Sequence, residues 1–121
     1  MTGAFRSLDE AQPFTTKDGS TIRELHHTVS QSLAEASLPP GGATQRHYHA
    51  RSEEIYFILE GAGTIEVDGE RRRVRAGDAV LIPPGARHTI AAAGQLRFLC
   101  CCSPPYRDED TYFEEREAAI D

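Results

Sequence analysis

The sequence predicts an all-β domain, either a sandwich or a closed barrel, and three observations lead to this class. From Ile22 onward the chain divides into short runs rich in β-branched and aromatic residues, separated by glycine and proline turns. Asp68-Gly69 lies between two such runs, where a two-residue hairpin needs positive φ at both central positions. Only Thr111–Ala119 has a helical pattern, so the strands are not expected to alternate with helices.

The strands are predicted from the runs between these turns. They are Ile22–Val29, Gln31–Leu38, Thr44–His49, Glu54–Glu60, Gly63–Val67, Glu70–Arg75, Ala79–Ile82, His88–Ala92 and Leu96–Cys102. Residues 1–21 are polar and are expected to form an N-terminal arm. Residues 106–121 are expected to form an acidic tail or a short helix. No linker divides the chain, so one domain over residues 1–121 is predicted.

Composition excludes several classes of protein. The 121 residues are 39% hydrophobic and 26% charged, which allows a single packed core. The net charge is −6, and the tail from residue 106 contributes most of it, because it holds seven acids and two arginines. The remaining body is nearly neutral and lacks the basic surface that nucleic-acid binding requires. No run approaches the roughly 20 apolar residues of a membrane span or resembles a signal peptide, so a cytoplasmic protein is expected.

Three histidines and a glutamate form a candidate metal site. His47 and His49 are two residues apart on a predicted strand, so their imidazoles point to the same face. Glu54 opens the next strand, and His88 follows a Pro-Pro-Gly turn. Such a mixed nitrogen and oxygen site suits one divalent ion of Fe, Mn, Ni, Co, Cu or Zn. The ordinary alternative is two surface histidines beside an unrelated His88.

The spacing of these residues resembles the two motifs of the cupin superfamily. The chain reads Gly41-x5-His47-x-His49-x4-Glu54-x6-Gly61 and then Gly77-x5-Pro83-x-Gly85-x2-His88. The family pattern ends on an asparagine four residues later, where this chain has Ala92. The matched motifs span residues 41–92. The resemblance implies a small single-domain cupin, a jelly-roll barrel of the double-stranded β-helix type, with a ligand cavity in its mouth.

Glu53 competes with Glu54 for the role of the carboxylate ligand. The six-residue interval to Gly61 fits only Glu54. Strand parity then places Tyr56 and Ile58 inside the barrel beside Glu54. We therefore expect Glu54 to be the ligand, and Ile55, Phe57 and Leu59 to face outward.

Three further residues are candidates for positioning or proton transfer. Gln45 faces inward by the same parity and would orient an imidazole or a ligand, although an ordinary polar residue at the rim is an equal alternative. Tyr56 would hold a substrate oxygen, unless it is only a wall aromatic. His27 is the one outlying candidate for a general base, although a strand histidine is more often packed or solvated.

Two arginines and three consecutive cysteines are also considered as site residues. Arg23 and Arg87 would suit a carboxylate or phosphate on a substrate. Cys100, Cys101 and Cys102 are consecutive on a strand, so they cannot surround one metal, and they are predicted to be small wall residues. No protein nucleophile stands beside a base in the motifs, so the chemistry is expected at the metal.

We therefore predict a metal-dependent enzyme that acts on a small molecule. The resemblance to cupins implies a dioxygenase, isomerase, decarboxylase or lyase, whose oxygen-bearing substrate chelates the metal. The alternative is a non-catalytic sensor or carrier that binds a metal and a ligand. The outward row of Ile55, Phe57 and Leu59, together with Tyr48, predicts a homodimer, because exposed apolar patches of this kind usually mark an interface.

Overall fold

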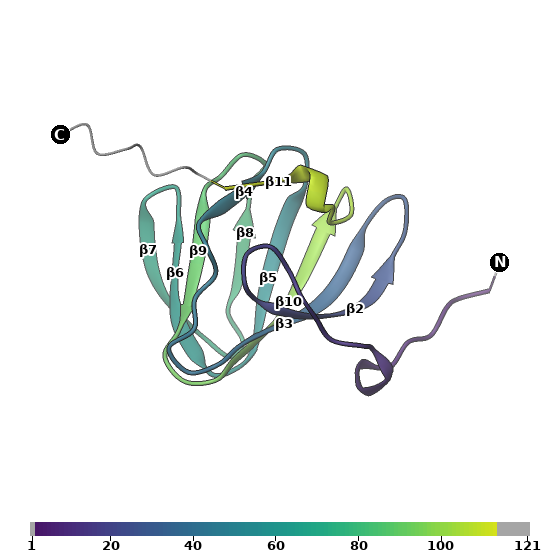
Figure 1. The fold of residues 1–121 in the computed structure, drawn as a ribbon, viewed down its shortest axis with the longest axis horizontal. Coiled ribbons are helices and arrows are strands. Elements are labelled where there is room, and N and C mark those ends of the chain that lie inside the picture. Colours follow the sequence, from purple (N-terminus) through teal and green to yellow (C-terminus); the bar gives the residue numbers. More distant parts are fainter. Residues whose placement is uncertain (1, 114–121) are drawn as a thin grey trace.

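The computed structural model describes residues 2–113, which form two antiparallel β-sheets facing each other (Figure 1). The first sheet has the order β1-β2-β3-β10-β5-β8. Its strands are β1 (Phe14–Thr15), β2 (Thr21–His27), β3 (Ser32–Leu38), β5 (Glu53–Glu60), β8 (Ala79–Ile82) and β10 (Leu96–Ser103). The second sheet has the order β11-β4-β9-β6-β7. Its strands are β4 (His47–His49), β6 (Ala62–Val67), β7 (Glu70–Arg75), β9 (His88–Ala92) and β11 (Thr111–Phe113).

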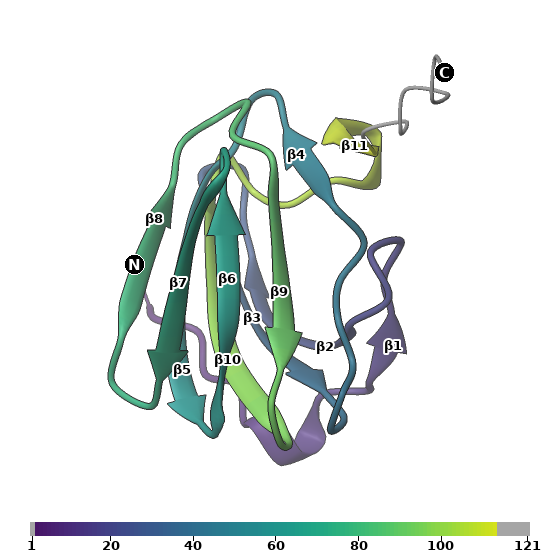
Figure 2. The same ribbon diagram turned by 90° about the vertical axis from the view of Figure 1, so that its left-hand side faces the viewer.

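This arrangement is a jelly roll, and it confirms the predicted all-β class. Figure 2 shows β6, β7 and β9 of the second sheet in front of β5 and β10 of the first. Two short 3₁₀ helices, η1 (Leu8–Glu10) and η2 (Asp108–Asp110), are the only helices in the described residues. Neither is long or apolar enough to cross a lipid bilayer.

The strand that carries His47 and His49 is shorter than predicted. The prediction began at Thr44, whereas β4 begins at His47. The Thr44 amide donates to the Ile90 carbonyl, but the Gln45 amide donates to the carbonyl of Asp18, at 2.8 Å. The segment before β4 is therefore held by the N-terminal region rather than by a regular strand ladder.

The chain after β10 also differs from its prediction. A helix was expected over Thr111–Ala119, but Thr111–Phe113 forms β11, which pairs antiparallel with β4. Tyr112 stacks on Tyr48 across this pair, with 5.2 Å between the ring centroids. The pairing satisfies an edge of β4 that a short charged helix would leave exposed. The rest of the expected helix lies outside the described residues.

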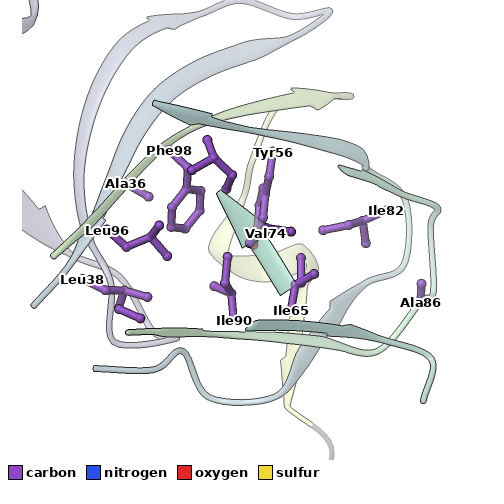
Figure 3. Packing of buried hydrophobic residues seen from close by; sticks show 12 residues of the cluster. Ala36, Leu38, Tyr56, Ile65, Val74, Ile82, Ala86, Ile90, Leu96 and Phe98 are labelled. Atoms are coloured by element: carbon purple, nitrogen blue, oxygen red, sulfur yellow. The ribbon is translucent and has the colours of Figure 1, made fainter. Parts of the chain in front are cut away.

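The inward faces of the strands fill one core (Figure 3). Along β5, Glu54, Tyr56 and Ile58 are buried, whereas Ile55 and Phe57 are about 40% exposed. This alternation confirms the parity that favoured Glu54 over Glu53, because Glu53 is exposed. The largest fully buried apolar side chains are Phe98, Ile58, Ile82, Ile90 and Leu96.

Two of the predicted turns depend on glycine. Asp68 and Gly69 have φ values of 48° and 85° between β6 and β7, which is the hairpin that the sequence predicts. Gly61, the last residue of the first motif, has φ of 87°. A Cβ on Gly61 would lie 2.1 Å from the Gln95 carbonyl oxygen, so any side chain there would push the β5–β6 turn away from the segment between β9 and β10.

Ala92 replaces the final asparagine of the second motif without loss of the local turn. The Ala92 amide donates to the Gly42 carbonyl, and the Gly41 amide donates to the Ala92 carbonyl. Main-chain bonds therefore tie the end of β9 to the start of the first motif.

Candidate metal centre

Three histidines from neighbouring strands bring their ring nitrogens together. His47 and His49 are the two ends of β4, and His88 begins β9 directly opposite His47 in the sheet register. One ligand atom from each lies within 4.8 Å of the other two. All three side chains are buried. The structure therefore gathers the predicted histidines into one group that can hold a metal ion.

The outer ring nitrogens of two of these histidines are held by main-chain carbonyls. His47 Nδ1 donates to the Gln45 carbonyl at 2.6 Å, and His88 Nδ1 donates to the Ala86 carbonyl at 2.9 Å. A neutral imidazole that donates through Nδ1 carries its lone pair on Nε2. Both Nε2 atoms are thus prepared as metal ligands, with their orientation set by the chain itself.

His49 is oriented by the segment that follows β10. Its Nδ1 donates to the carbonyl of Asp110 and to the hydroxyl of Thr111, each at 3.3 Å. The buried carboxylate of Asp110 also accepts the three successive amides of residues 50–52, all at 3.1 Å. The turn between β4 and β5 is therefore built around Asp110. Sequence reasoning missed this residue because the acidic tail offers no pattern that singles out one carboxylate.

Glu54 completes the predicted ligand set. Its Oε1 lies 3.3 Å from His88 Nε2 and 3.5 Å from His49 Nε2. Glu54 Oε1 and His88 Nε2 are also the buried side-chain polar atoms that lack a hydrogen-bond partner among the described residues. A buried acceptor without a partner is costly, and a cation between these atoms would satisfy both. The residues present therefore fit a divalent metal ion.

The protonation equilibria show how strongly these groups interact without a metal. Burial alone would raise the pKa of Glu54, but contacts with His49 and His88 outweigh it and hold the pKa far below 4.5. Burial alone would lower the pKa of His49, but Glu54 outweighs it and raises this pKa above 6.5. For His47, burial prevails and lowers the pKa. A proton on His49 thus occupies the place that a metal would take.

The site opens into a cavity between the two sheets. The volume open to the centre of a water molecule is about 40 Å³, which is room for a few waters at the roughly 10–15 Å³ that each needs. Tyr56 lies in the wall, with its ring 6.0 Å from that of His88. Among the described residues that line this cavity, none is a lysine or an arginine. The cavity walls therefore provide no cationic side chain for a substrate.

The cysteines lie where wall residues were predicted. Cys100 and Cys102 line the cavity, whereas Cys101 is exposed. The Cys102 thiol donates to Glu54 Oε2 at 3.4 Å and so helps to orient this carboxylate. Burial, reinforced by the charge of Glu54, raises the pKa of both Cys100 and Cys102. Both thiols therefore stay protonated, which makes them poor nucleophiles.

Two of the predicted positioning residues lie away from the cavity lining. The Gln45 side chain is exposed, because β4 begins only at His47 and the parity of a strand does not extend back to residue 45. Its main chain, not its amide group, contacts His47. His27 is exposed at the end of β2 and contacts Glu24 Oε2 at 3.1 Å. A bulge between Glu24 and His26 shifts the register that the prediction assumed.

The two candidate arginines also lie outside the cavity. Arg87 places its guanidinium 3.7 Å from the centroid of the Tyr48 ring and donates to the Gly85 carbonyl. Arg23 lies opposite Glu35 in the β2–β3 register. Neither arginine is among the residues that line the cavity.

Sequence reasoning missed a second carboxylate, that of Asp18. Asp18, in the turn between β1 and β2, lines the cavity and places Oδ2 3.5 Å from His47 Nε2. The sequence signal was the turn Lys17-Asp18-Gly19-Ser20, which predicts a loop but does not show that the loop lies beside the histidines.

A jelly roll with a histidine and carboxylate centre in its mouth defines a class of metal-binding barrel proteins. The Cupin domain family matches the chain over residues 34–102, which is more than half of its length. The chain belongs to the cupin family, as the two motifs predict. This family commonly binds a metal, and the histidine group described above provides a place for one.

Several known proteins resemble the chain. The protein MJ1618 of Methanocaldococcus jannaschii is 50% identical over 110 residues, covering 85% of this chain and 88% of that protein. The oxalate-binding protein of Thermotoga maritima is 34% identical over 79 residues, covering 64% of this chain and 65% of that protein. Dimethylsulfoniopropionate lyase DddW of Ruegeria pomeroyi is 40% identical over 67 residues, or 54% of this chain and 43% of the lyase.

A solved structure confirms the fold. KdgF from Halomonas sp. superimposes with a TM-score of 0.80 at 27% identity, covering 89% of this chain and 98% of KdgF. The relatives thus include both a binding protein and an enzyme, and they support membership of a family of cupin enzymes without defining one activity.

Proposed function

We propose that this protein is a metal-dependent enzyme that acts on a small oxygen-bearing molecule, most consistently as an oxygenase, an isomerase or a lyase. One observation carries the proposal. His47, His49 and Glu54 line a cavity, and His88 Nε2 lies 3.3 Å from Glu54 Oε1. An accessible metal position distinguishes working centres from structural ones.

The residues of the site can be assigned roles in metal and substrate binding. His47, His49, His88 and Glu54 would hold the ion, which when bound would act as a Lewis acid toward a substrate oxygen. Because the cavity walls carry no lysine or arginine, the substrate depends on the ion rather than on a side chain for electrostatic attraction. Tyr56 would position the substrate from the wall.

The substrate is expected to be small and to bind through oxygen atoms. The free volume near the ligands holds only a few waters, so a compact hydroxy acid, keto acid or dicarboxylate fits better than a large molecule. The oxalate-binding relative supports the same class of ligand. This relative also favours the second candidate function, a carrier or sensor that binds such a ligand without converting it.

The test is a reconstituted protein screened for both binding and turnover. Apo-protein is loaded anaerobically with Fe(II), or with Mn(II), Co(II), Ni(II) or Zn(II), and incubated with a panel of small hydroxy acids, keto acids and dicarboxylates. Product formation is followed by NMR, and oxygen uptake by an electrode. Turnover that is absent from His88→Ala supports the enzyme. Metal-dependent binding with no turnover of any compound in the panel supports the carrier, and failure to bind metal refutes both.

A further inference from the structure

We propose that Asp18 is a fifth protein ligand of the metal, which the N-terminal hairpin brings to the site. The inference rests on the metal centre proposed above and extends it beyond the two sequence motifs. It concerns a residue 29 positions before His47, in the segment that the sequence predicts to be only an arm.

The first argument is the spacing of the atoms. Asp18 Oδ2 lies 3.5 Å from His47 Nε2. This equals the separation between Glu54 Oε1 and His49 Nε2, which belong to the predicted ligand set. Glu54 approaches two of the three histidines, and Asp18 approaches the third. Between them the two carboxylates reach every imidazole of the group.

The second argument is the mismatch of hydrogen-bonding roles between Asp18 and His47. His47 Nδ1 is 2.6 Å from the Gln45 carbonyl and therefore carries the proton of the neutral ring. Its Nε2 is then an acceptor, and it faces the carboxylate oxygen of Asp18, which is also an acceptor. Two acceptors that face each other repel, and a divalent metal between them would accept a lone pair from each.

The third argument is that the Asp18 side chain is fixed before any ligand arrives. Its Oδ1 accepts hydrogen bonds from the Ser20 amide, the Ser20 hydroxyl and the Thr16 hydroxyl, at 2.9, 2.7 and 2.6 Å. Its carbonyl accepts from the Gln45 amide at 2.8 Å. These bonds leave Oδ2 directed at His47. The main chain of one residue, Gln45, thus orients His47 through its carbonyl and anchors Asp18 through its amide.

Two consequences follow for the site. Five protein ligands, two of them carboxylates, balance the charge of a divalent ion and leave one position on a six-coordinate metal. A chelating substrate has to displace Asp18, whereas a substrate that binds through one oxygen does not. Metal binding would also add a second link between the N-terminal hairpin and β4, beyond the main-chain bond from Gln45, because Asp18 and His47 would share the ion.

The experiment compares three full-length proteins with Co(II) as the probe. Asp18→Asn keeps an oxygen for the turn hydrogen bonds but weakens the ligand atom. Glu24→Gln is the matched control, because Glu24 is another carboxylate in the cavity wall whose contact is with His27. Co(II) affinity is measured by competition with a chelator. Hydrogen exchange of residues 14–20 is measured with and without Co(II).

We expect Asp18→Asn to weaken Co(II) binding by about 10-fold or more and Glu24→Gln to leave it within about twofold. Co(II) should slow exchange of residues 14–20 in the wild type and in Glu24→Gln, but not in Asp18→Asn. Wild-type protein in which Co(II) leaves this exchange unchanged overturns the role of Asp18, and this measurement needs no variant. Unchanged Co(II) affinity in Asp18→Asn would also overturn the role of Asp18, but it would leave the proposed site of three histidines and Glu54 intact. If the wild type binds no Co(II), the proposed metal centre is refuted together with this inference.

Discussion

The two ends of the barrel interior are built on the same strands but carry opposite chemistry. Each inward row begins with polar residues at the site end and continues with apolar ones. On β9 the row runs from His88 to Ile90, and on β5 it runs from Glu54 to Ile58. On β10 it runs from Cys102, whose thiol donates to Glu54, to Leu96. The closed end is held by apolar packing, whereas the site end is held by side chains bonded to main-chain groups.

This difference shows that stability and metal binding depend on separate sets of residues. Packing at the closed end requires only shape and hydrophobicity, which many sequences satisfy. Ligand placement at the open end depends on main-chain carbonyls. Those of Gln45 and Ala86 are local, and that of Asp110 comes from about 60 residues away. The two ends should therefore fail independently when they are mutated.

Replacing a metal ligand should have the largest effect, a loss of metal affinity at the site end without a loss of folding at the closed end. His88→Ala is expected to lower metal affinity by at least about 100-fold, because loss of a ligand exceeds the loss of an outer-shell partner. Bound metal is measured by elemental analysis after dialysis, and folding by circular dichroism. His26→Ala is the control, since His26 lies on β2 outside the cavity lining. Full metal content in His88→Ala would remove this residue from the site.

Truncating the closed end should have the opposite result. Leu96 is fully buried, so Leu96→Ala is expected to cost about 2–5 kcal/mol of unfolding free energy through lost contacts and a cavity. Denaturant unfolding of the apo-protein measures this loss. Metal stoichiometry of the folded variant should stay at the wild-type value. A change in stoichiometry would mean that the two ends are coupled.

The pH dependence should distinguish the empty site from the loaded one. The pKa of Glu54 is lowered on folding, so its contribution to stability is present above about 4.5 and is lost as the pH falls. The pKa of His49 is raised, so its contribution is present below about 6.5 and is lost as the pH rises through the folded value. The apo-protein should therefore be most stable between these limits.

Metal binding requires neutral imidazoles, so the loaded protein should not lose stability at higher pH in the same way. The increase in Tm that Co(II) causes should grow as the pH rises from about 5 to about 8. Glu54→Gln should flatten the acidic loss in the apo-protein. An equal increase in Tm at both pH values would contradict the competition between the proton and the metal.

The outer face of the first sheet should affect neither end of the interior, and a change there is expected to alter only the association of the chains. Ile55 and Leu81 pair across β5 and β8, and with Phe57 they form an exposed apolar patch. We propose that a second copy of this chain covers the patch. Tyr48 does not extend it, since Tyr48 lies on the other sheet and stacks with Tyr112.

Light scattering should then give twice the 13.3 kDa of the chain at micromolar concentration. Phe57→Glu should halve this mass while the metal content stays constant, because a buried charge opposes the contact. Val29→Glu is the control, since Val29 is also apolar and exposed but lies in the β2–β3 turn. A wild-type mass near that of one chain would refute the dimer.

The smallest effect is expected at the exposed thiol. Cys101→Ser should change neither Tm nor metal content, because Cys101 contacts neither the cavity nor Glu54. Alkylation of the folded protein should modify Cys101 before Cys100 and Cys102, as mass spectrometry of peptides can show. If alkylation abolishes activity while the metal remains bound, a cysteine takes part in the chemistry.

The sequence predicted most of the fold from local periodicity and turn signals, and the centre of the site from motif spacing. The six-residue interval to Gly61 selected Glu54, the alternation on β5 agrees with that choice, and the turn at Asp68-Gly69 placed a hairpin. The residues that sequence reasoning misplaced lie where periodicity ends. Gln45 precedes its strand by two residues, and His27 follows a bulge.

The residues that sequence reasoning missed come from long-range placement. Asp18 and Asp110 lie in polar turns with no strand pattern, and their partners are 29 and about 60 positions away. A single sequence does not show which acidic side chain contacts the site. The turns that hold Asp18 and Asp110 have the same composition as ordinary surface turns.

The carboxylate of Asp110, around which the turn between β4 and β5 is built, is synthesised late during translation. His49 and the turn after it leave the ribosome about 60 residues before the carboxylate that holds them. Until residue 110 emerges, the amides of residues 50–52 and the Nδ1 of His49 lack the partners seen in the folded chain. The nascent barrel can therefore collapse around its apolar end first, and it gains a rigid ligand set only as the last described strand is added.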